Sequence, residues 1–247
     1  MTWNWIKSEN VDKIKLSCIF YSGDRMKLIA HRGNTSDNYG ENTKEAILSA
    51  LEKNYIAGIE TDVRMTYDQK FVLNHNVTID HTSNGRGFVA LMSLKELQKY
   101  QFGTTEHPTK IAVLEDVLKA IHSDKLILLE LKHETDLYDI YLKKLTKLLH
   151  KFSHLNVYLC SFHYDLILKM KTMNPKIPCG LIIGPLLNQN KDYNAFDFLV
   201  IEQHLRLPNT KKELFLWTVN KTIPNESVSY LITDKPERLA KELGDLR

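Results

Sequence analysis

The segment Gly58–Asn76 reads GIETDVRMTYDQKFVLNHN and predicts two short strands joined by a tight polar turn. In its first half, apolar residues alternate with Glu60, Asp62 and Arg64. Successive side chains on a strand point to opposite faces, so Glu60 and Asp62 are expected to lie side by side on one face. Two adjacent carboxylates repel each other unless a cation lies between them or one of them stays protonated.

The second predicted strand, Phe71–Leu73, is followed closely by His75. Two converging oxygen ligands with an imidazole nearby are typical of a metal-assisted site with acid–base chemistry. Taken alone, the same pattern also fits an antiparallel strand whose acidic residues face solvent. A single histidine is likewise more often a surface or core residue than a catalyst. The rest of the chain has to discriminate between these interpretations.

Composition excludes several classes of protein. The 247 residues, 43% of them hydrophobic, suit one large α/β barrel or two small domains. The 33 basic and 30 acidic residues are mixed along the chain without a basic block, so no nucleic-acid partner is indicated. No apolar run approaches the roughly 20 residues of a transmembrane segment. The three cysteines form no metal or disulfide pattern, which favours a reducing cytoplasm.

The chain begins with a strand–helix–strand unit. Lys27–Ala30 reads as a buried strand, and a polar loop leads from it into a helix. Asn42 and Glu45 resemble a capping box at the start of that helix, although Thr43 is an alternative cap. The helix leads directly into the strand Gly58–Val63, so a parallel sheet is expected.

Strand and helix signals alternate over the remaining chain after a long polar segment, residues 76–110, that we expect to be a capping insertion. Nine segments have strand character, whereas a closed (β/α)8 barrel has eight, and we assign Gly180–Ile183 as the surplus one. We therefore predict an α/β fold, a distorted TIM (β/α)8 barrel with a small capping insertion after the third strand. The single barrel domain is expected over residues 26–247, after an N-terminal extension over residues 1–25. The later strands are expected at Lys125–Lys132, Val157–Ser161, Asp197–Ile201, Leu214–Val219 and Tyr230–Thr233, and the later helices at Leu114–Ile121, Thr135–Lys151, Tyr164–Met173 and from Pro236 to Gly244.

Polar residues collect near the C-terminal ends of the predicted strands, where active sites of such barrels lie. Three carboxylates among them offer hard oxygen ligands for Mg²⁺ or Ca²⁺. Two histidines are paired candidates for acid and base, and two cationic side chains suit a phosphate-bearing substrate. Each residue taken separately is also explained by a buried ion pair or a capping contact. The carboxylates are Glu60, Asp62 and Glu130, the histidines His31 and His75, and the cations Arg32 and Lys132.

An ordered set of motifs runs along the chain. It comprises HRG at 31–33, ENT at 41–43, ExD at 60–62, His75, a TSNGxG turn at 82–87, ExK at 130–132, SFH at 161–163, WTVN at 217–220 and ITDKP at 232–236. From about Lys27 to Leu239 this set resembles the glycerophosphodiester phosphodiesterase (GDPD) family of the PLC-like phosphodiesterase superfamily. The resemblance implies a distorted TIM barrel, a divalent cation, and hydrolysis of small-molecule glycerophosphodiesters to sn-glycerol 3-phosphate and an alcohol.

The resemblance also implies a role for each matching residue. Trp217 corresponds to an aromatic residue that lines the substrate pocket, although it also fits ordinary barrel core. Glu41 either orients Arg32 or approaches the metal, and Asn42 either supports a residue that binds the metal or substrate or is only a helix cap. The remaining matches are His31 and His75 as catalytic residues, Glu60, Asp62 and Glu130 as metal ligands, and Arg32 and Lys132 as phosphate contacts.

The chain departs from the family pattern at several positions. Asn76 follows His75 where the family usually has aspartate, and His81 replaces the arginine before the TSNGxG turn. Gly40 replaces the usual proline before ENT, and the segment from Asn220 to Tyr230 is too short for the helix usually found there. These changes leave the expected ligands in place and bear on substrate choice and catalytic strength.

Three functions follow from these observations. The leading one is a metal-dependent glycerophosphodiester phosphodiesterase. The second uses the same residues on lysophospholipids, as a lysophospholipase D-type enzyme does, and requires an exposed apolar surface such as Phe88–Met92 in the insertion. The third is a non-catalytic barrel that binds phosphodiesters, which the departures at Asn76 and His81 keep open.

Overall fold

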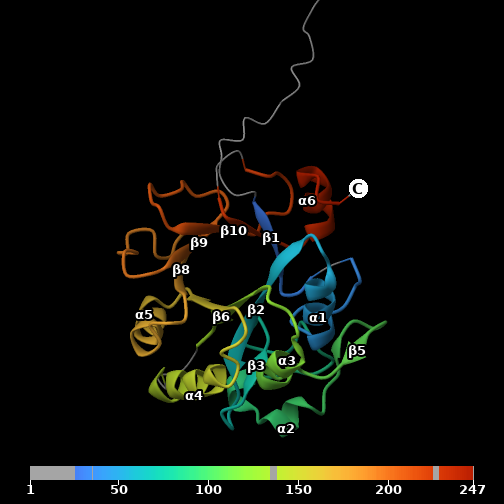
Figure 1. Ribbon diagram of the computed structural model, residues 1–247. Coiled ribbons are helices and arrows are strands. Elements are labelled where there is room, and N and C mark those ends of the chain that lie inside the picture. The colour runs from blue at the N-terminus through green and yellow to red at the C-terminus, as the bar shows by residue number, and fades with distance from the viewer. Residues whose placement is uncertain (1–25, 35, 134–137, 225–227, 247) are drawn as a thin grey trace, which may run out of the picture.

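A closed ring of parallel strands forms the centre of the protein. The computed structural model describes residues 26–34, 36–133, 138–224 and 228–246, and the expected extension over residues 1–25 lies outside them. Within these ranges, eight parallel strands follow one another around the ring and the last pairs with the first. Helices lie outside the strands (Figure 1). The predicted (β/α)8 barrel is therefore confirmed. None of the described helices is long and apolar enough to span a membrane.

The elements follow the predicted alternation closely. The helix predicted at Thr135–Lys151 includes residues 135–137, which lie outside the described ranges. Of the two caps considered for the first helix, Thr43 is the N-cap. In ring order, the strands are β1 (Lys27–His31), β2 (Ile56–Met65), β6 (Leu126–Leu131), β7 (Val157–Ser161), β8 (Cys179–Ile183), β9 (Phe198–Glu202), β10 (Glu213–Trp217) and β11 (Tyr230–Thr233). The outer helices are α1 (Lys44–Glu52), α3 (Leu114–Ala120), α4 (Tyr138–His150), α5 (Tyr164–Met173) and α6 (Pro236–Leu243).

Strand alternation divides the core into two layers. Ile59 and Val63 of β2 belong to the large apolar layer between strands and helices. The opposite strand faces fill the barrel interior, where the rings of Phe215 and Tyr230 stack 4.3 Å apart and Phe198 packs against Phe215. Phe215 and Tyr230 lie towards the N-terminal half of the barrel, so the polar residues of β2 occupy the interior nearer the C-terminal end.

The strand outside the ring is β3 (Phe71–Leu73), and our assignment of Gly180–Ile183 as the surplus strand is wrong. That segment is β8, which is buried throughout and pairs with both β7 and β9. β3 instead pairs antiparallel with the end of β2, Val63 opposite Leu73. A parallel connection needs about a dozen residues or more, whereas residues 66–70 allow only a hairpin. The length of the connection between strands, rather than the length of a strand, indicates which strand lies outside the ring.

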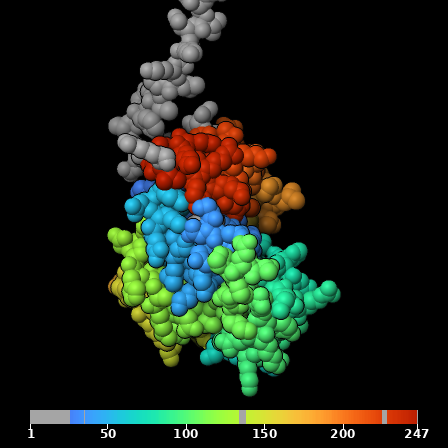
Figure 2. All heavy atoms as spheres, turned by 90° about the vertical axis from the view of Figure 1, so that its right-hand side faces the viewer, coloured from blue at the N-terminus to red at the C-terminus, as the bar shows by residue number. Residues whose placement is uncertain are grey.

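The segment 76–110 forms a small lobe beside the barrel, seen in green against the blue atoms of the α1 region in Figure 2. It contains η1 (Val89–Leu91), α2 (Leu94–Leu97), β4 (Phe102–Gly103) and β5 (Pro108–Thr109), and α2 begins with a capping box formed by Ser93 and Glu96. The backbone of Gly103 lies directly against Gly40, since a Cβ atom on Gly40 would be 2.5 Å from the Cα atom of Gly103. This contact leaves no room for proline at position 40.

Gly58 offers a test of how tightly the barrel closes. A Cβ atom there would lie 2.3 Å from the carbonyl oxygen of Leu126 on the neighbouring strand. We expect Gly58→Ala to lower the free energy of unfolding by about 1–3 kcal/mol, as overpacking does, measured by urea denaturation. Gly184→Ala is the matched control, because its nearest neighbour is a Phe162 ring atom at 3.2 Å. A Gly58→Ala variant as stable as the wild type would contradict the close approach of β2 and β6 at this position.

Candidate functional site

One pocket at the C-terminal ends of the strands brings most of the predicted site residues together. It encloses about 90 Å³, well below the roughly 300–1,000 Å³ of pockets for drug-sized ligands. Only a small moiety of a substrate can therefore be enclosed. Its polar lining consists of His31, Arg32, Glu60, His75, Glu130, Lys132 and Thr218, and its apolar lining includes Phe162, Trp217, Leu128, Ile182, Val200 and Ile232.

His75 reaches this pocket by a different route from the one that we expected. The expectation was that His75 follows a strand whose end lies at the barrel rim. Instead β2 continues beyond the ring and β3 runs back along it, so that the backbone N–H of Asn74 donates to the carbonyl of Asp62 at 3.1 Å. The hairpin thus returns His75 to the level of the carboxylates. Its Nδ1 lies 2.9 Å from Oδ1 of Asn76.

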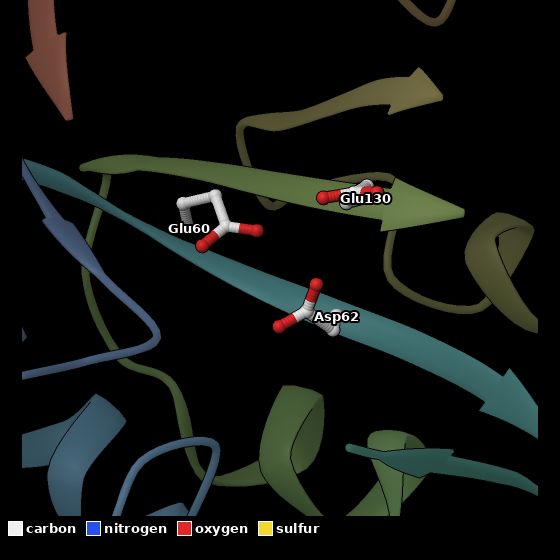
Figure 3. A group of neighbouring side chains, drawn as sticks. All are labelled: Glu60, Asp62 and Glu130. Carbon is white, nitrogen blue, oxygen red and sulfur yellow. The ribbon is translucent and has the colours of Figure 1, made fainter. Parts of the chain in front are cut away.

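The three carboxylates form a compact cluster on β2 and β6. Glu60, Asp62 and Glu130 each offer one oxygen, and these oxygens lie within 4.8 Å of one another. Figure 3 shows the three groups on the same side of the two neighbouring strands. Nζ of Lys132 lies 2.6 Å from Glu130 and 3.1 Å from Asp62, which balances part of the negative charge.

The surroundings of the cluster shift the acidities of its members in opposite directions. Burial, together with the negative charge of Asp62, raises the pKa of Glu60 to about 8. Burial acts in the same sense on Asp62, but the charges of Lys132, His75 and Arg32 outweigh it and lower the pKa of Asp62 to about 2. Burial also raises the pKa of the Glu130 carboxyl. One member of the cluster therefore prefers to be protonated at neutral pH.

A divalent cation fits this cluster. Oε1 of Glu60 is buried and has no hydrogen-bond partner, whereas Oε2 accepts from the backbone N–H of Arg32 at 3.2 Å. An unpartnered buried carboxylate oxygen is costly, and a hard cation supplies the missing contact. The donor set of carboxylate oxygens is the one that Mg²⁺ and Ca²⁺ prefer.

Glu41 and Asn42 lie outside the pocket lining, and each bonds one residue of the candidate site. Both carboxylate oxygens of Glu41 accept from Nη1 of Arg32, at 3.0 and 2.9 Å, and Glu41 lies outside the carboxylate cluster. Nδ2 of Asn42 donates to Asp62 at 2.9 Å, while its Oδ1 accepts from Asp62 N–H. Of the partners left open by the sequence, Glu41 contacts Arg32 rather than the carboxylate cluster, and Asn42 contacts Asp62, whereas Thr43 is the N-cap of α1.

His31 has a partner that our sequence analysis missed. Its Nδ1 lies 2.6 Å from Oδ1 of Asp234, which also accepts from Asn34 and, through Oδ2, from Asn220. Burial alone would lower the pKa of His31, but the hydrogen bond to Asp234 and the charge of Glu60 raise it. Asp234 directly follows β11, so the strand-end rule that selected the other residues could have found it.

Trp217 fits both interpretations made from the sequence. It lines the pocket, and it packs against the apolar interior of the barrel. Its ring meets that of Phe162 edge to face, 5.6 Å between centroids. Part of the pocket lining is therefore aromatic.

The comparisons with known proteins agree with this geometry. Residues 31–237 match the Glycerophosphoryl diester phosphodiesterase family. The Bacillus subtilis (strain 168) protein YhdW is 33% identical over 240 residues, covering 88% of this chain and 98% of YhdW. Glycerophosphodiester phosphodiesterase of Caldanaerobacter subterraneus subsp. tengcongensis is 32% identical over 235 residues, covering 86% and 95%. An Oleispira antarctica phosphodiesterase, solved in complex with the product sn-glycerol-3-phosphate, shares the fold with a TM-score of 0.79 at 20% identity over 89% of this chain and 96% of that one.

The acidity of Glu60 predicts that cation binding depends on pH. Below pH 8 the carboxyl of Glu60 holds a proton in the cation-free protein, and a cation must displace it. The affinity for Mg²⁺ should therefore rise about tenfold per pH unit between pH 6 and 8, and level off above. Calorimetric titrations in two buffers of different ionisation enthalpy count the released proton. Affinity that does not change over this range would contradict the raised pKa of Glu60.

Proposed function

The chain belongs to the Glycerophosphoryl diester phosphodiesterase family, and on this premise we propose that it hydrolyses glycerophosphodiesters to sn-glycerol 3-phosphate and an alcohol with a divalent cation. The observation that carries the proposal is the buried cluster of Glu60, Asp62 and Glu130, of which Glu60 and Glu130 line one pocket with two histidines. The name of the Caldanaerobacter relative and the product bound to the Oleispira enzyme support the same substrate class. The cysteine pattern supports a cytoplasmic location for this activity.

In this proposal the charged side chains of the site hold the phosphate. Glu60, Asp62 and Glu130 would hold Mg²⁺ or Ca²⁺, which, when bound, neutralises phosphate oxygens and makes phosphorus more electrophilic. Arg32 and Lys132 would bind the remaining phosphate oxygens and stabilise the charge that develops on them. Glu41 keeps the guanidinium of Arg32 in position for this contact.

The two histidines divide the proton transfers. Burial, with the charges of Lys132 and Arg32, lowers the pKa of His75, so its imidazole is neutral and suits a base. With Nδ1 bonded to Asn76, Nε2 is available to remove a proton from water, or from the neighbouring hydroxyl of the substrate glycerol in a route through a cyclic phosphate.

His31 would act as the acid. Asp234 favours its protonated form, so Nε2 can donate a proton to the leaving alkoxide oxygen as the phosphorus–oxygen bond breaks. Under this assignment, the departure from aspartate at position 76 removes a charge from beside the base and favours its neutral form.

The test is an assay of sn-glycerol 3-phosphate release from glycerophosphocholine and glycerophosphoethanolamine after chelation. We expect activity to return with Mg²⁺ or Ca²⁺ only, and to be absent in Glu60→Gln. His75→Ala should lower turnover by roughly 10²–10⁴-fold, the usual contribution of a general base.

The exposed His150→Ala is the matched control and should keep wild-type turnover. Circular dichroism establishes that each variant is folded. Wild-type turnover in His75→Ala would remove His75 from the mechanism, and inactivity with every cation in a folded protein would overturn the proposed function.

A second candidate, the lysophospholipase D-type activity, is favoured by exposed apolar side chains on the insertion and on the loop after β8. Phe88 and Leu91 are 53% and 73% exposed, on the insertion that follows His75, whereas Val89 between them is buried. Leu186, 95% exposed, precedes Leu187 in the loop that adjoins the aromatic part of the lining. Because the pocket encloses only a small moiety, a longer substrate would extend over these side chains.

Comparing lysophosphatidylcholine with glycerophosphocholine separates the two candidates. If an acyl chain lies on these side chains, Phe88→Ser with Leu186→Ser should lower kcat/KM for lysophosphatidylcholine about tenfold, the effect of losing about 1.4 kcal/mol of apolar contact. Glycerophosphocholine turnover should not change. Ile140→Ser, on α4, is the control at an exposed apolar site. No turnover of lysophosphatidylcholine by the wild type would exclude this candidate.

A further inference from the structure

A buried arginine lies beneath the loop that carries His75. Arg64 follows Glu60 and Asp62 at the next alternate position of β2, so all three point to the same strand face. Only 4% of Arg64 is exposed. It lies outside the lining of the pocket, so it has no direct path to a substrate.

The guanidinium of Arg64 binds the backbone on either side of the histidine's Cα. Its Nε donates to the carbonyl oxygens of Asn74 and His75, at 3.0 and 3.2 Å. Its Nη2 donates to the carbonyl of His75 as well. One planar group with donors in a rigid fork thus fixes two successive peptide units.

A buried amide holds the next part of the same loop. Nδ2 of Asn74 donates to the carbonyl of Asn76 at 2.7 Å and to that of Thr78 at 3.0 Å. Oδ1 of Asn74 accepts from the hydroxyl of Thr82 at 2.8 Å. The loop leaves the β2–β3 ladder at this point, so these side chains supply the donors that strand pairing no longer provides.

We propose that Arg64 is a positioning residue that sets the imidazole of His75 relative to the carboxylate cluster by binding the loop backbone. The inference rests on the proposed role of His75 as base. A base has to be within hydrogen-bond distance of the proton that it removes, and a displacement of about 1 Å can cost about 10²-fold in rate. Arg64 fixes the backbone of the loop, while Asn76 orients the ring through Nδ1.

A different role is also compatible with the position of Arg64, namely charge balance for Asp62 and Glu130. The negative charges of both carboxylates interact with its guanidinium. The two roles predict different results. Charge balance affects the carboxylate cluster and hence cation affinity, with or without His75. Positioning affects turnover, and only when His75 is present.

The experiment is a double-mutant cycle between Arg64→Met and His75→Ala. Arg64→Met should lower kcat for glycerophosphocholine about 10²-fold, with KM and Mg²⁺ affinity changed less than about threefold. In the His75→Ala background the same substitution should change turnover less than about twofold, because its effect passes through His75. Arg86→Met, at an exposed arginine of the insertion, is the matched control.

The outcomes separate this inference from the proposed function. An equal loss in both backgrounds, or a large loss of Mg²⁺ affinity, would overturn it in favour of charge balance. Wild-type turnover in Arg64→Met, with His75→Ala impaired, would overturn the inference alone, whereas wild-type turnover in His75→Ala would overturn the proposed chemistry.

Folding of the variants is decided by circular dichroism. Arg64→Gln keeps one amide donor and should fall between wild type and Arg64→Met in kcat. If Arg64→Met does not fold, Arg64→Gln replaces it in the double-mutant cycle. Failure of both variants to fold would assign Arg64 to folding rather than to positioning.

Discussion

The repulsion among three buried carboxylates is the constraint to which the rest of the site responds. Glu60, Asp62 and Glu130 are brought together by strand alternation and by the register of β2 and β6, in which Asp62 lies opposite Glu130. An ionised carboxylate is costly to bury without partners. Lys132 contacts Asp62 and Glu130, and Asp62 also accepts a hydrogen bond, whereas one oxygen of Glu60 has no hydrogen-bond partner. Part of the negative charge is therefore balanced within the protein, and the unpartnered oxygen of Glu60 is the atom to which a cation would add a contact.

The two histidines are held in unlike ways, and this difference matches their different acidities. His31 is held through its side chain by Asp234, whose negative charge favours the imidazolium. His75 is held chiefly through its backbone, by groups that add no negative charge next to its ring. The groups that bind the two imidazoles thus raise the pKa of one and leave the pKa of the other lowered, which is the difference that the proposed donor and acceptor roles require.

How far the sequence predicted this arrangement depends on the range of the interactions involved. That Glu60 and Asp62 share one strand face is a local property of an alternating strand, and the barrel follows from repeated strand–helix units. Both could therefore be predicted. The exclusion of β3 from the ring depended on connection length, which we did not weigh. The place of Asp234 at a strand end could be predicted locally, but its pairing with His31, 203 positions away, could not. Whether Glu41 approached the cluster or bound Arg32 was likewise a matter of three-dimensional distance.

The close approach of Gly40 and Gly103 joins the insertion to the loop that carries Glu41 and Asn42, the residues that orient Arg32 and Asp62. The backbones of these two segments therefore cannot change independently at this contact. If the insertion were taken from a family member that has proline before ENT, residues 40 and 103 would have to be exchanged together. In an evolving lineage, position 40 could gain a side chain only if the backbone at residue 103 moved, and Gly103 is itself fixed as glycine by its positive φ and by the nearby carbonyl of His107.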